Sequence, residues 1–389
     1  MVYEVWTGAV QIERQAGMMA DSVARLRFLR GAMRDCRRNL EVSPAPLPRP
    51  PRRPALPLLA AFLLLSCAAS TADAVRPETS AERPPVAVDP PEVWLVERTA
   101  DGELYSNGLR IEHRLAVSTR HRLYRLVPYS DNQQPSQRWQ TRPAGIVYHA
   151  SEGDLASFAE EHSGRIRRQS LDLLSYAQRH RLYHYVVDRF GGVHRIVEES
   201  DVADHAGHSV WADSHGVYLN LNASFLGVAF AARTAGGASA ELLTPAQVHA
   251  GRVLTDLLRA KYRIAPGNCV THAQVSVNPF NSFIGFHSDW ARGFPFAELG
   301  LPDNYQAPPP SMTQFGFSYE AAFFEAAGPG LRAALRRAQE EVRQAAAARR
   351  LTAARWRAAL LEHYRTAAAK AATERAALEA LARMEVYQP

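Results

Sequence analysis

The sequence has few cysteines and no long hydrophobic run, and both shortages narrow the classes of protein that it can encode. Only three cysteines occur in 389 residues. That number is too small for a disulfide framework or for a zinc site built from several thiolates. The longest apolar run, ALPLLAAFLLL, covers only residues 55–65. It is too short for a stable membrane span, which needs about 20 residues, but it has the length of a signal-peptide core.

Strong positive charge is missing from the middle of the chain, although the whole chain carries +6. Residues 1–54 carry a net charge of +5 and residues 331–389 one of +6, which leaves −5 for residues 55–330. A mildly acidic centre argues against a basic groove that follows phosphates, so we expect no nucleic-acid partner. Hydrophobic residues make up 47% of the chain and charged residues 22%. This balance is that of a protein with a folded core.

The region around the apolar run has the features of a bacterial export signal. Three arginines within residues 49–53 precede the run, which continues into Leu64-Leu65-Ser66-Cys67. This ending resembles a lipobox, in which the cysteine is lipidated and becomes the mature N-terminus. The alternative is ordinary cleavage after Ala74, at the end of an A-x-A site. We therefore expect an exported, periplasmic lipoprotein anchored to the membrane through Cys67, or a protein secreted after cleavage at Ala74.

Composition divides the chain into five parts. Short β-type runs begin at residue 93, with turn signals at Asp101-Gly102 and Asn107-Gly108, and suggest a small antiparallel element before the main domain. In chain order, we expect an N-terminal extension outside the mature protein (1–54), a lipoprotein-type signal core with its lipobox (55–67), a linker (68–92), the main domain (93–310), and a linker with a helical C-terminal extension (311–389).

The main domain reads as alternating strands and helices, so the predicted fold class is α/β, with a mixed central β-sheet flanked by helices and an Ala/Arg-rich helical extension at the C-terminus. Thr244-Pro245-Ala246-Gln247 opens a helix that runs to about Tyr262, because it offers an N-cap, a proline at the first helical position and a glutamine three residues after the cap. The other expected elements are strands at 145–150, 225–232 and 268–273, a hairpin at 183–197 and a helix at 154–180.

The C-terminal stretch, residues 331–386, contains neither glycine nor proline and is rich in Ala, Arg, Glu and Leu. This composition predicts a long helix or a helical hairpin. Because its apolar residues are mostly alanine, little area is buried per turn. We therefore expect a solvated spacer, dispensable for the chemistry, rather than a specific binding device.

Histidine is concentrated in the main domain, where 11 of the 14 histidines lie between His149 and His287. His149 and His272 each stand at the end of an expected strand, and Asp289 follows in a loop rich in glycine and aromatic residues. Two histidines and a carboxylate form a common catalytic zinc set, with the fourth position left for water. Zinc lowers the pKa of that water to about 7 and polarises a carbonyl oxygen, so the set predicts a metal-assisted amide hydrolase.

Seven short sequence motifs occur in a defined order along the main domain: IVYHAS, YHYVVDRFGGVHRI, HAGHS, NASFLGV, LTPAQ, YRIAPGNCVTHAQV and HSDWARGFPF. Over residues 143–300 the series resembles the zinc-dependent N-acetylmuramoyl-L-alanine amidases of the phage-lysozyme type, which are related to the peptidoglycan recognition proteins. The resemblance implies hydrolysis of the amide between N-acetylmuramic acid and L-alanine, in cell-wall degradation, remodelling or recycling. The expected partners are peptidoglycan or muropeptides, and we expect the chain to be a monomer.

The resemblance also implies roles for individual side chains. It assigns a Zn²⁺ ion to His149, His272 and Asp289. Tyr183 matches a tyrosine beside the zinc-bound water. His287 matches the position of a lysine that stabilises the oxyanion, which a histidine can also do as a hydrogen-bond donor.

Two further positions match substrate contacts, and two differ from the family pattern. His205 and Asn222 match substrate-contacting residues in the HAG and N-x-S words. Ala229 replaces a glutamate that the family often uses as a general base, so Tyr183 would have to suffice. The additional residues 277–286 could shift the last ligand position from Asp289 to His287. A non-catalytic peptidoglycan-binding module of the same fold is the alternative function, and the three competent ligand positions favour catalysis.

Overall fold

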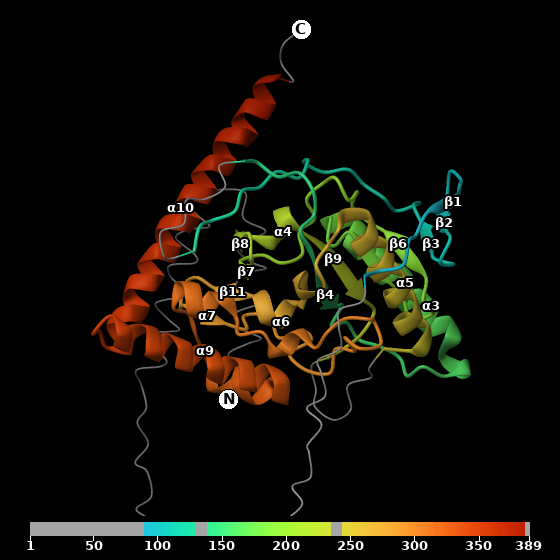
Figure 1. Ribbon diagram of the computed structural model, residues 1–389. Coiled ribbons are helices and arrows are strands. Elements are labelled where there is room, and N and C mark those ends of the chain that lie inside the picture. The colour runs from blue at the N-terminus through green and yellow to red at the C-terminus, as the bar shows by residue number, and fades with distance from the viewer. Residues whose placement is uncertain (1–88, 130–137, 235–242, 386–389) are drawn as a thin grey trace, which may run out of the picture. The chain divides into compact units, whose positions relative to one another are not determined.

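An eight-stranded mixed β-sheet forms the centre of the computed structural model, which describes residues 89–129, 138–234 and 243–385 (Figure 1). The strand order is β1-β2-β3-β6-β5-β9-β4-β10, and β5, β9, β4 and β10 run parallel to one another. The strands are β1 (Leu95–Arg98), β2 (Gly102–Tyr105), β3 (Arg110–Glu112), β4 (Gly145–Ala150), β5 (Tyr185–Val187), β6 (Val193–Arg195), β9 (Phe225–Phe230) and β10 (Cys269–Thr271).

Two long helices cover the two faces of this sheet. Alternate side chains of β4, β5 and β9 pack against α5 (Pro245–Tyr262), while Val186 of β5 and Ala229 of β9, on the other face, meet α3 (Ser163–His180). The helix α5 begins as its sequence predicts, with a capping box between Thr244 and Gln247 and a proline in its first turn. Cys269 is a buried core residue of β10. The predicted α/β class with a mixed central sheet is confirmed.

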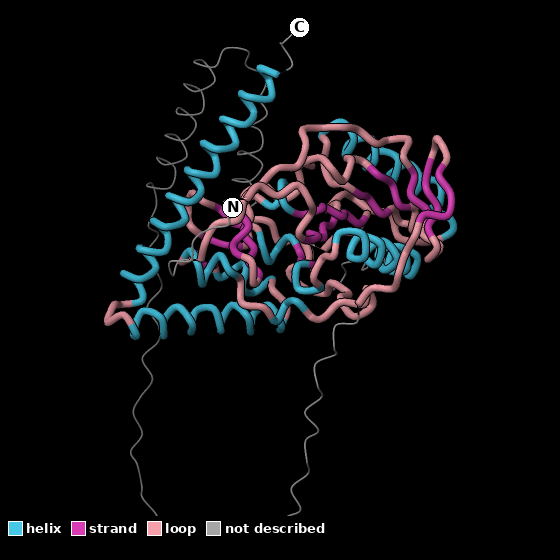
Figure 2. Tube along the Cα trace, turned by 45° about the horizontal axis from the view of Figure 1, so that its top comes forward, coloured by secondary structure: helices cyan, strands magenta, loops and turns pink. Residues whose placement is uncertain are grey.

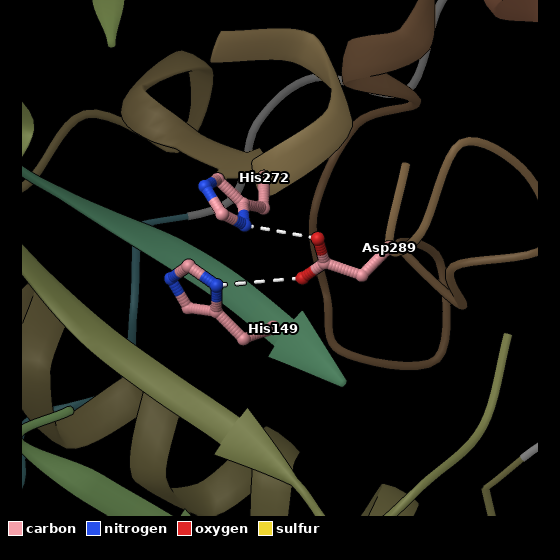
Figure 3. A group of neighbouring side chains, drawn as sticks. All are labelled: His149, His272 and Asp289. Carbon is pink, nitrogen blue, oxygen red and sulfur yellow. Dashed lines mark hydrogen bonds and ion pairs between the residues drawn. The ribbon is translucent and has the colours of Figure 1, made fainter. Parts of the chain in front are cut away.

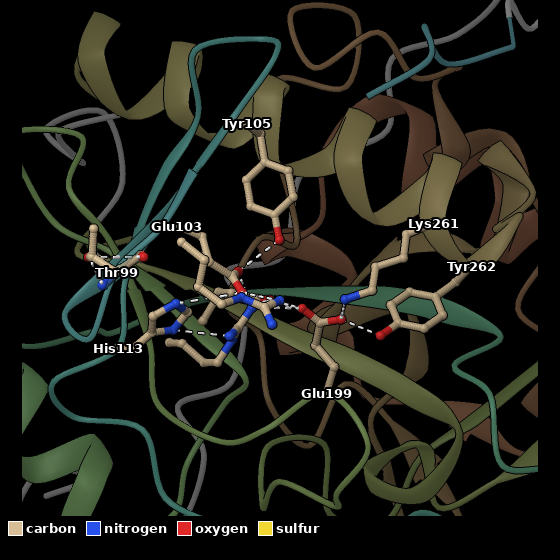
Figure 4. Close-up of polar contacts among 11 residues, drawn as sticks. Thr99, Glu103, Tyr105, His113, Glu199, Lys261 and Tyr262 are labelled. Carbon is tan, nitrogen blue, oxygen red and sulfur yellow. Dashed lines mark hydrogen bonds and ion pairs between the residues drawn. The ribbon is translucent and has the colours of Figure 1, made fainter. Parts of the chain in front are cut away.

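The β1–β3 meander is antiparallel as predicted, but it extends the central sheet instead of standing before it, because β3 pairs in parallel with β6. A network of ion pairs connects the meander to the rest of the domain (Figure 4). The Arg195 guanidinium lies 3.0 Å from the Glu103 carboxylate and 3.2 Å from that of Glu199, which the Lys261 ammonium approaches at 2.6 Å. Burial alone would raise the pKa of Glu199, and the charges of Lys261 and Arg195 lower it to about 2.

Several predicted elements are longer than those observed, and two of the differences have a clear local cause. The helix expected over 154–180 begins only at Ser163, after a single 3₁₀ turn η1 (Glu160–His162). The preceding loop is held by the Gln169 side chain, which accepts from the Ala156 amide at 2.9 Å and donates to the Asp154 carbonyl at 2.9 Å. The strand expected over 268–273 ends at Thr271, because a Thr271–Gln274 capping box starts the short helix α6 (His272–Val275) there.

The smaller elements surround the sheet at its ends. A hairpin forms from β7 (Val210–Asp213) and β8 (Gly216–Leu219), and a small sheet from β11 (Val277–Asn278), β12 (Phe283–Ile284) and β13 (Ser318–Tyr319). The short helices are α4 (Leu221–Ser224), η3 (Pro266–Asn268), η4 (Asn304–Gln306), α7 (Pro310–Phe315) and α8 (Ala321–Ala326). None of the helices in the described ranges combines the length and apolarity needed to cross a bilayer.

The C-terminal extension is a helical hairpin of α9 (Pro329–Ala348) and α10 (Ala353–Glu385), which Figure 2 shows meeting at a short turn. It is not simply solvated, and the packing shows no break near residue 310. Side chains of α7, α9 and α10 are buried in the same hydrophobic cluster as those of the central sheet. The members from these three helices are Met312, Phe315, Leu331, Leu335, Ala338 and Tyr364. The expectation of a solvated spacer is therefore wrong for α9 and the first half of α10.

Candidate metal centre and active site

His149 lies near the end of β4, on the face of the sheet that α3 covers. Its neighbours Tyr148 and Ala150 point the other way, into the core beneath α5. In the adjacent strand β9, Ala229 stands directly beside His149. His149 as a whole residue is only 1% exposed. A buried histidine in this position needs partners for both ring nitrogens.

His272 and Asp289 reach the same place from two other segments. His272 is the first residue of α6, so the Thr271 cap that ends β10 also orients the imidazole. Asp289 precedes Trp290, a fully buried residue with a positive φ of 58°, which fixes the loop against the core. The backbone amide of Ala273 also donates to the Asp289 carbonyl at 3.2 Å. The local turn chemistry of both segments therefore presents the two side chains to His149.

The Asp289 carboxylate faces both imidazoles, with one oxygen directed to each (Figure 3). Its Oδ1 is 2.9 Å from His272 Nδ1 and its Oδ2 is 3.4 Å from His149 Nδ1. One ligand atom from each residue lies within 4.8 Å of the others, and in the described ranges this is the one group of three metal-competent side chains. The structure thus brings together the three predicted ligands, and His287 is not among them.

The hydrogen bonds of His149 show that the site fits a metal cation. The Phe225 carbonyl can only accept, so His205 Nε2 donates to it (3.4 Å), and His205 Nδ1 accepts from His149 Nε2 (3.1 Å). His149 then carries a lone pair on Nδ1, facing the Asp289 carboxylate. Two acceptors this close need a cation between them.

At neutral pH a proton does not supply that cation. Burial lowers the pKa of His149 to about 4, and the neighbouring His272 lowers it further. Burial alone would raise the pKa of Asp289, but His272 and His149 hold it well below its usual range, so the carboxylate stays ionised. Two imidazoles and one carboxylate are the donor set of a divalent first-row metal site.

The two predicted catalytic side chains flank this centre. The Tyr183 ring lies 5.0 Å from the His149 ring, and Tyr183 has a positive φ of 59°. Burial and the Asp289 charge raise the pKa of Tyr183, so its hydroxyl remains a donor. The His287 ring stacks on His272 at 4.6 Å, and burial lowers its pKa.

The two predicted substrate contacts lie one layer away from the ligand atoms. His205 is buried behind His149, and the Asn222 carboxamide oxygen accepts from the backbone amides of His205 (3.0 Å) and Ala206 (2.5 Å). Both residues therefore support the fold around the centre, and their contact with substrate stays a prediction. Ala229 is fully buried in β9, which confirms that this strand offers no carboxylate at that position.

Two residues that support the site were not predicted from the sequence. Gly227 lies under the His205 ring, where an added Cβ would stand 2.6 Å from His205 Cγ, so only glycine leaves room for that histidine. Thr271 caps α6 and thereby places His272 at a helix start. The sequence T-H-A-Q, residues 271–274, has the pattern of a capping box, so the role of Thr271 could have been predicted from it.

Residues 139–289 match the family model of N-acetylmuramoyl-L-alanine amidase. No curated protein sequence matches the chain significantly. Among solved structures, the chain is similar to the amidase AmiD of E. coli in complex with anhydro-N-acetylmuramic acid-L-Ala-D-γ-Glu-L-Lys. The identity is 22% over 39% of this chain, and the TM-score is 0.28. The chain spans only 57% of the length of AmiD.

Two other solved structures are similar to parts of the chain. AmpDh3 of Pseudomonas aeruginosa, in complex with an anhydromuramic pentapeptide, has 20% identity, 55% coverage of this chain, 88% of its own and a TM-score of 0.33. The Drosophila peptidoglycan recognition protein SD has 18% identity, 39% and 79% coverage and a TM-score of 0.24. The family match covers all three ligand positions. The chain therefore carries, in residues 139–289, a domain of the N-acetylmuramoyl-L-alanine amidase family.

Proposed function

We propose that this chain is a zinc-dependent N-acetylmuramoyl-L-alanine amidase, with His149, His272 and Asp289 as the zinc ligands. The observation that carries the proposal is the convergence of these three side chains, with a buried and ionised carboxylate, inside the family-matched region. In the reaction, water adds its oxygen to the lactyl carbonyl carbon. The bond from that carbon to the nitrogen of L-alanine breaks, and the amine takes up a proton. A zinc ion bound there would act as a Lewis acid toward the carbonyl oxygen and would lower the pKa of water.

The remaining chemistry falls to side chains of this chain. The Tyr183 hydroxyl is held protonated beside His149 and is available to orient water by a hydrogen bond. His287, neutral and stacked on His272, can donate from one ring nitrogen to the carbonyl oxygen as negative charge develops there. Such a donor contributes about 10²–10³ in rate. With Ala229 in place of a glutamate, neither role falls to β9.

Product analysis tests this function directly. We expect the purified protein to convert a muropeptide into a free stem peptide that begins with L-alanine and a saccharide that keeps its lactyl carboxylate. A chelator should stop the reaction, and added zinc should restore it, because the side chains alone do not activate water sufficiently. Mass spectrometry of the products provides the measurement. A muropeptide that binds the zinc-loaded protein but stays intact would favour the non-catalytic binding module.

We further propose that the chain is exported and anchored through a lipid on Cys67, which places the enzyme beside peptidoglycan. The support is the order of basic residues, apolar run and Leu-Leu-Ser-Cys in residues 49–67, which lie outside the described residues. Metabolic labelling with a radioactive fatty acid should mark the full-length chain and not its Cys67→Ser variant. Labelling that persists in the variant would reject the anchor and favour cleavage after Ala74.

A further inference from the structure

The segment between the last histidine ligand and the carboxylate ligand is uncharged and carries two exposed aromatic rings. Residues 276–286 read SVNPFNSFIGF, without one ionisable side chain. They form β11, β12 and the turn between them, with β13 as the third strand. Phe280 is 93% exposed and Phe286 is 62% exposed, the largest exposures among the large hydrophobic side chains of the described residues.

Phe286 is connected to the metal centre through ring contacts. Its ring meets the edge of His287 at 4.9 Å, and His287 stacks on the ligand His272 at 4.6 Å. The backbone of His287 is fixed, since its amide donates to Ser276 Oγ at 3.1 Å. Only the His287 ring therefore separates Phe286 from the predicted ligand His272, and the backbone next to Phe286 is fixed by a hydrogen bond. A substrate bound at the metal centre would cover the Phe286 ring.

The polar groups around these rings are neutral donors. Asn278 accepts from the Phe280 amide at 3.0 Å and Asn281 accepts from the Phe283 amide at 3.1 Å, both through the carboxamide oxygen. The NH₂ group of each side chain remains a donor. The charge that follows the third strand of this small sheet is Glu320, a carboxylate.

These features favour binding of the sugar half of a muropeptide over its peptide half. The stem peptide beyond L-alanine carries carboxylates, which gain nothing from an uncharged hairpin next to Glu320. A sugar ring offers an apolar face for an aromatic side chain and hydroxyl and acetamido groups for amide donors. Building on the proposed amidase function, we propose that Phe286 and Phe280 form the binding surface for the N-acetylmuramoyl sugar ring, with Phe286 nearer the scissile amide.

Kinetics with two substrates test this assignment. One is N-acetylmuramoyl-tripeptide, and the other is the same tripeptide acylated with D-lactate, which has the scissile amide but no sugar. We expect Phe286→Ala to raise KM for the first substrate about twofold to twelvefold with little change in kcat, because an aromatic contact worth about 0.5–1.5 kcal/mol is lost from both ground and transition states. KM for the lactoyl peptide should not change.

Two further variants complete the test. Phe286→Trp keeps an aromatic face and should retain KM for the sugar substrate. Trp94→Ala removes a ring of similar exposure (60%) beside β1, at the opposite end of the sheet, and should change neither substrate. Equal effects of Phe286→Ala on both substrates, or no effect on either, would overturn the sugar surface while leaving the amidase function intact. Failure of the wild-type protein to hydrolyse either substrate would reject the amidase function, and the sugar surface with it.

Discussion

Replacing Asp289 by alanine is expected to empty the metal centre and abolish hydrolysis. The carboxylate is the group that contacts both imidazoles, at 2.9 Å and 3.4 Å, and it is the one negative charge of the ligand set. Without it only the two histidines of the group remain, which is too few ligands for a stable protein zinc site. We expect bound zinc to fall from about one per chain to near zero. Metal analysis of the dialysed protein, together with muropeptide hydrolysis, measures both effects.

His287→Ala is the matched control, because this residue lies two positions away and was the alternative ligand in the sequence. It stacks on His272 but is not a member of the ligand group. The variant should therefore keep its zinc and lose only about 10²–10³ in kcat, as for one oxyanion donor. Zinc lost from His287→Ala and kept by Asp289→Ala would show that the ligand assignment is wrong.

A third variant distinguishes a residue that orients a metal ligand from a residue that is itself a ligand. His205→Phe removes the acceptor for His149 Nε2 while keeping an aromatic ring over Gly227. Loss of such a partner typically weakens metal affinity 10- to 100-fold, so competition with a chelator should place this variant between wild type and Asp289→Ala. An affinity equal to that of the wild type would show that His205 does not orient the ligand.

Removal of the C-terminal hairpin is expected to unfold the domain. A chain that ends at residue 329 lacks the buried side chains of α9 and α10, which pack on α7 and on Phe317. Fully burying a large apolar side chain contributes about 1.5–3 kcal/mol, and total stability is only about 5–15 kcal/mol. The larger buried side chains lost are Leu331, Leu335, Val342, Leu360 and Tyr364. Thermal unfolding should show a large loss of stability or no cooperative transition.

The control is a chain that ends after Ala376, which keeps these side chains and also the ion pair between Arg125 and Glu374. It should unfold at nearly the wild-type temperature and keep its activity. If the chain ending at residue 329 is as stable as this control, the hairpin is a spacer after all, and its apolar contacts do not contribute to stability.

The sequence determined those features that depend on local chemistry. Thr244 and Pro245 define the start of α5, the glycines at 191 and 192 define the turn between β5 and β6, and GIVYHA forms a buried strand. The grouping of His149, His272 and Asp289 could be predicted because their residue types and the order of the surrounding motifs carry the family pattern. The cap, turn and strand signals each lie within a few residues of chain, and the family pattern is read from the order of motifs, so neither needed knowledge of the packing.

The tertiary structure decided what distant segments do to one another. Only the assembled structure shows that Asp289, 140 residues from His149 in the sequence, groups with His149 and His272, whereas His287 is not part of that group. His205 lies behind His149 because Gly227, from another strand, leaves space beneath its ring. The alanine-rich α9 became part of the core because α7 and α10 cover its few leucines. Burial is a property of the assembled surfaces, and composition alone does not reveal which surfaces meet.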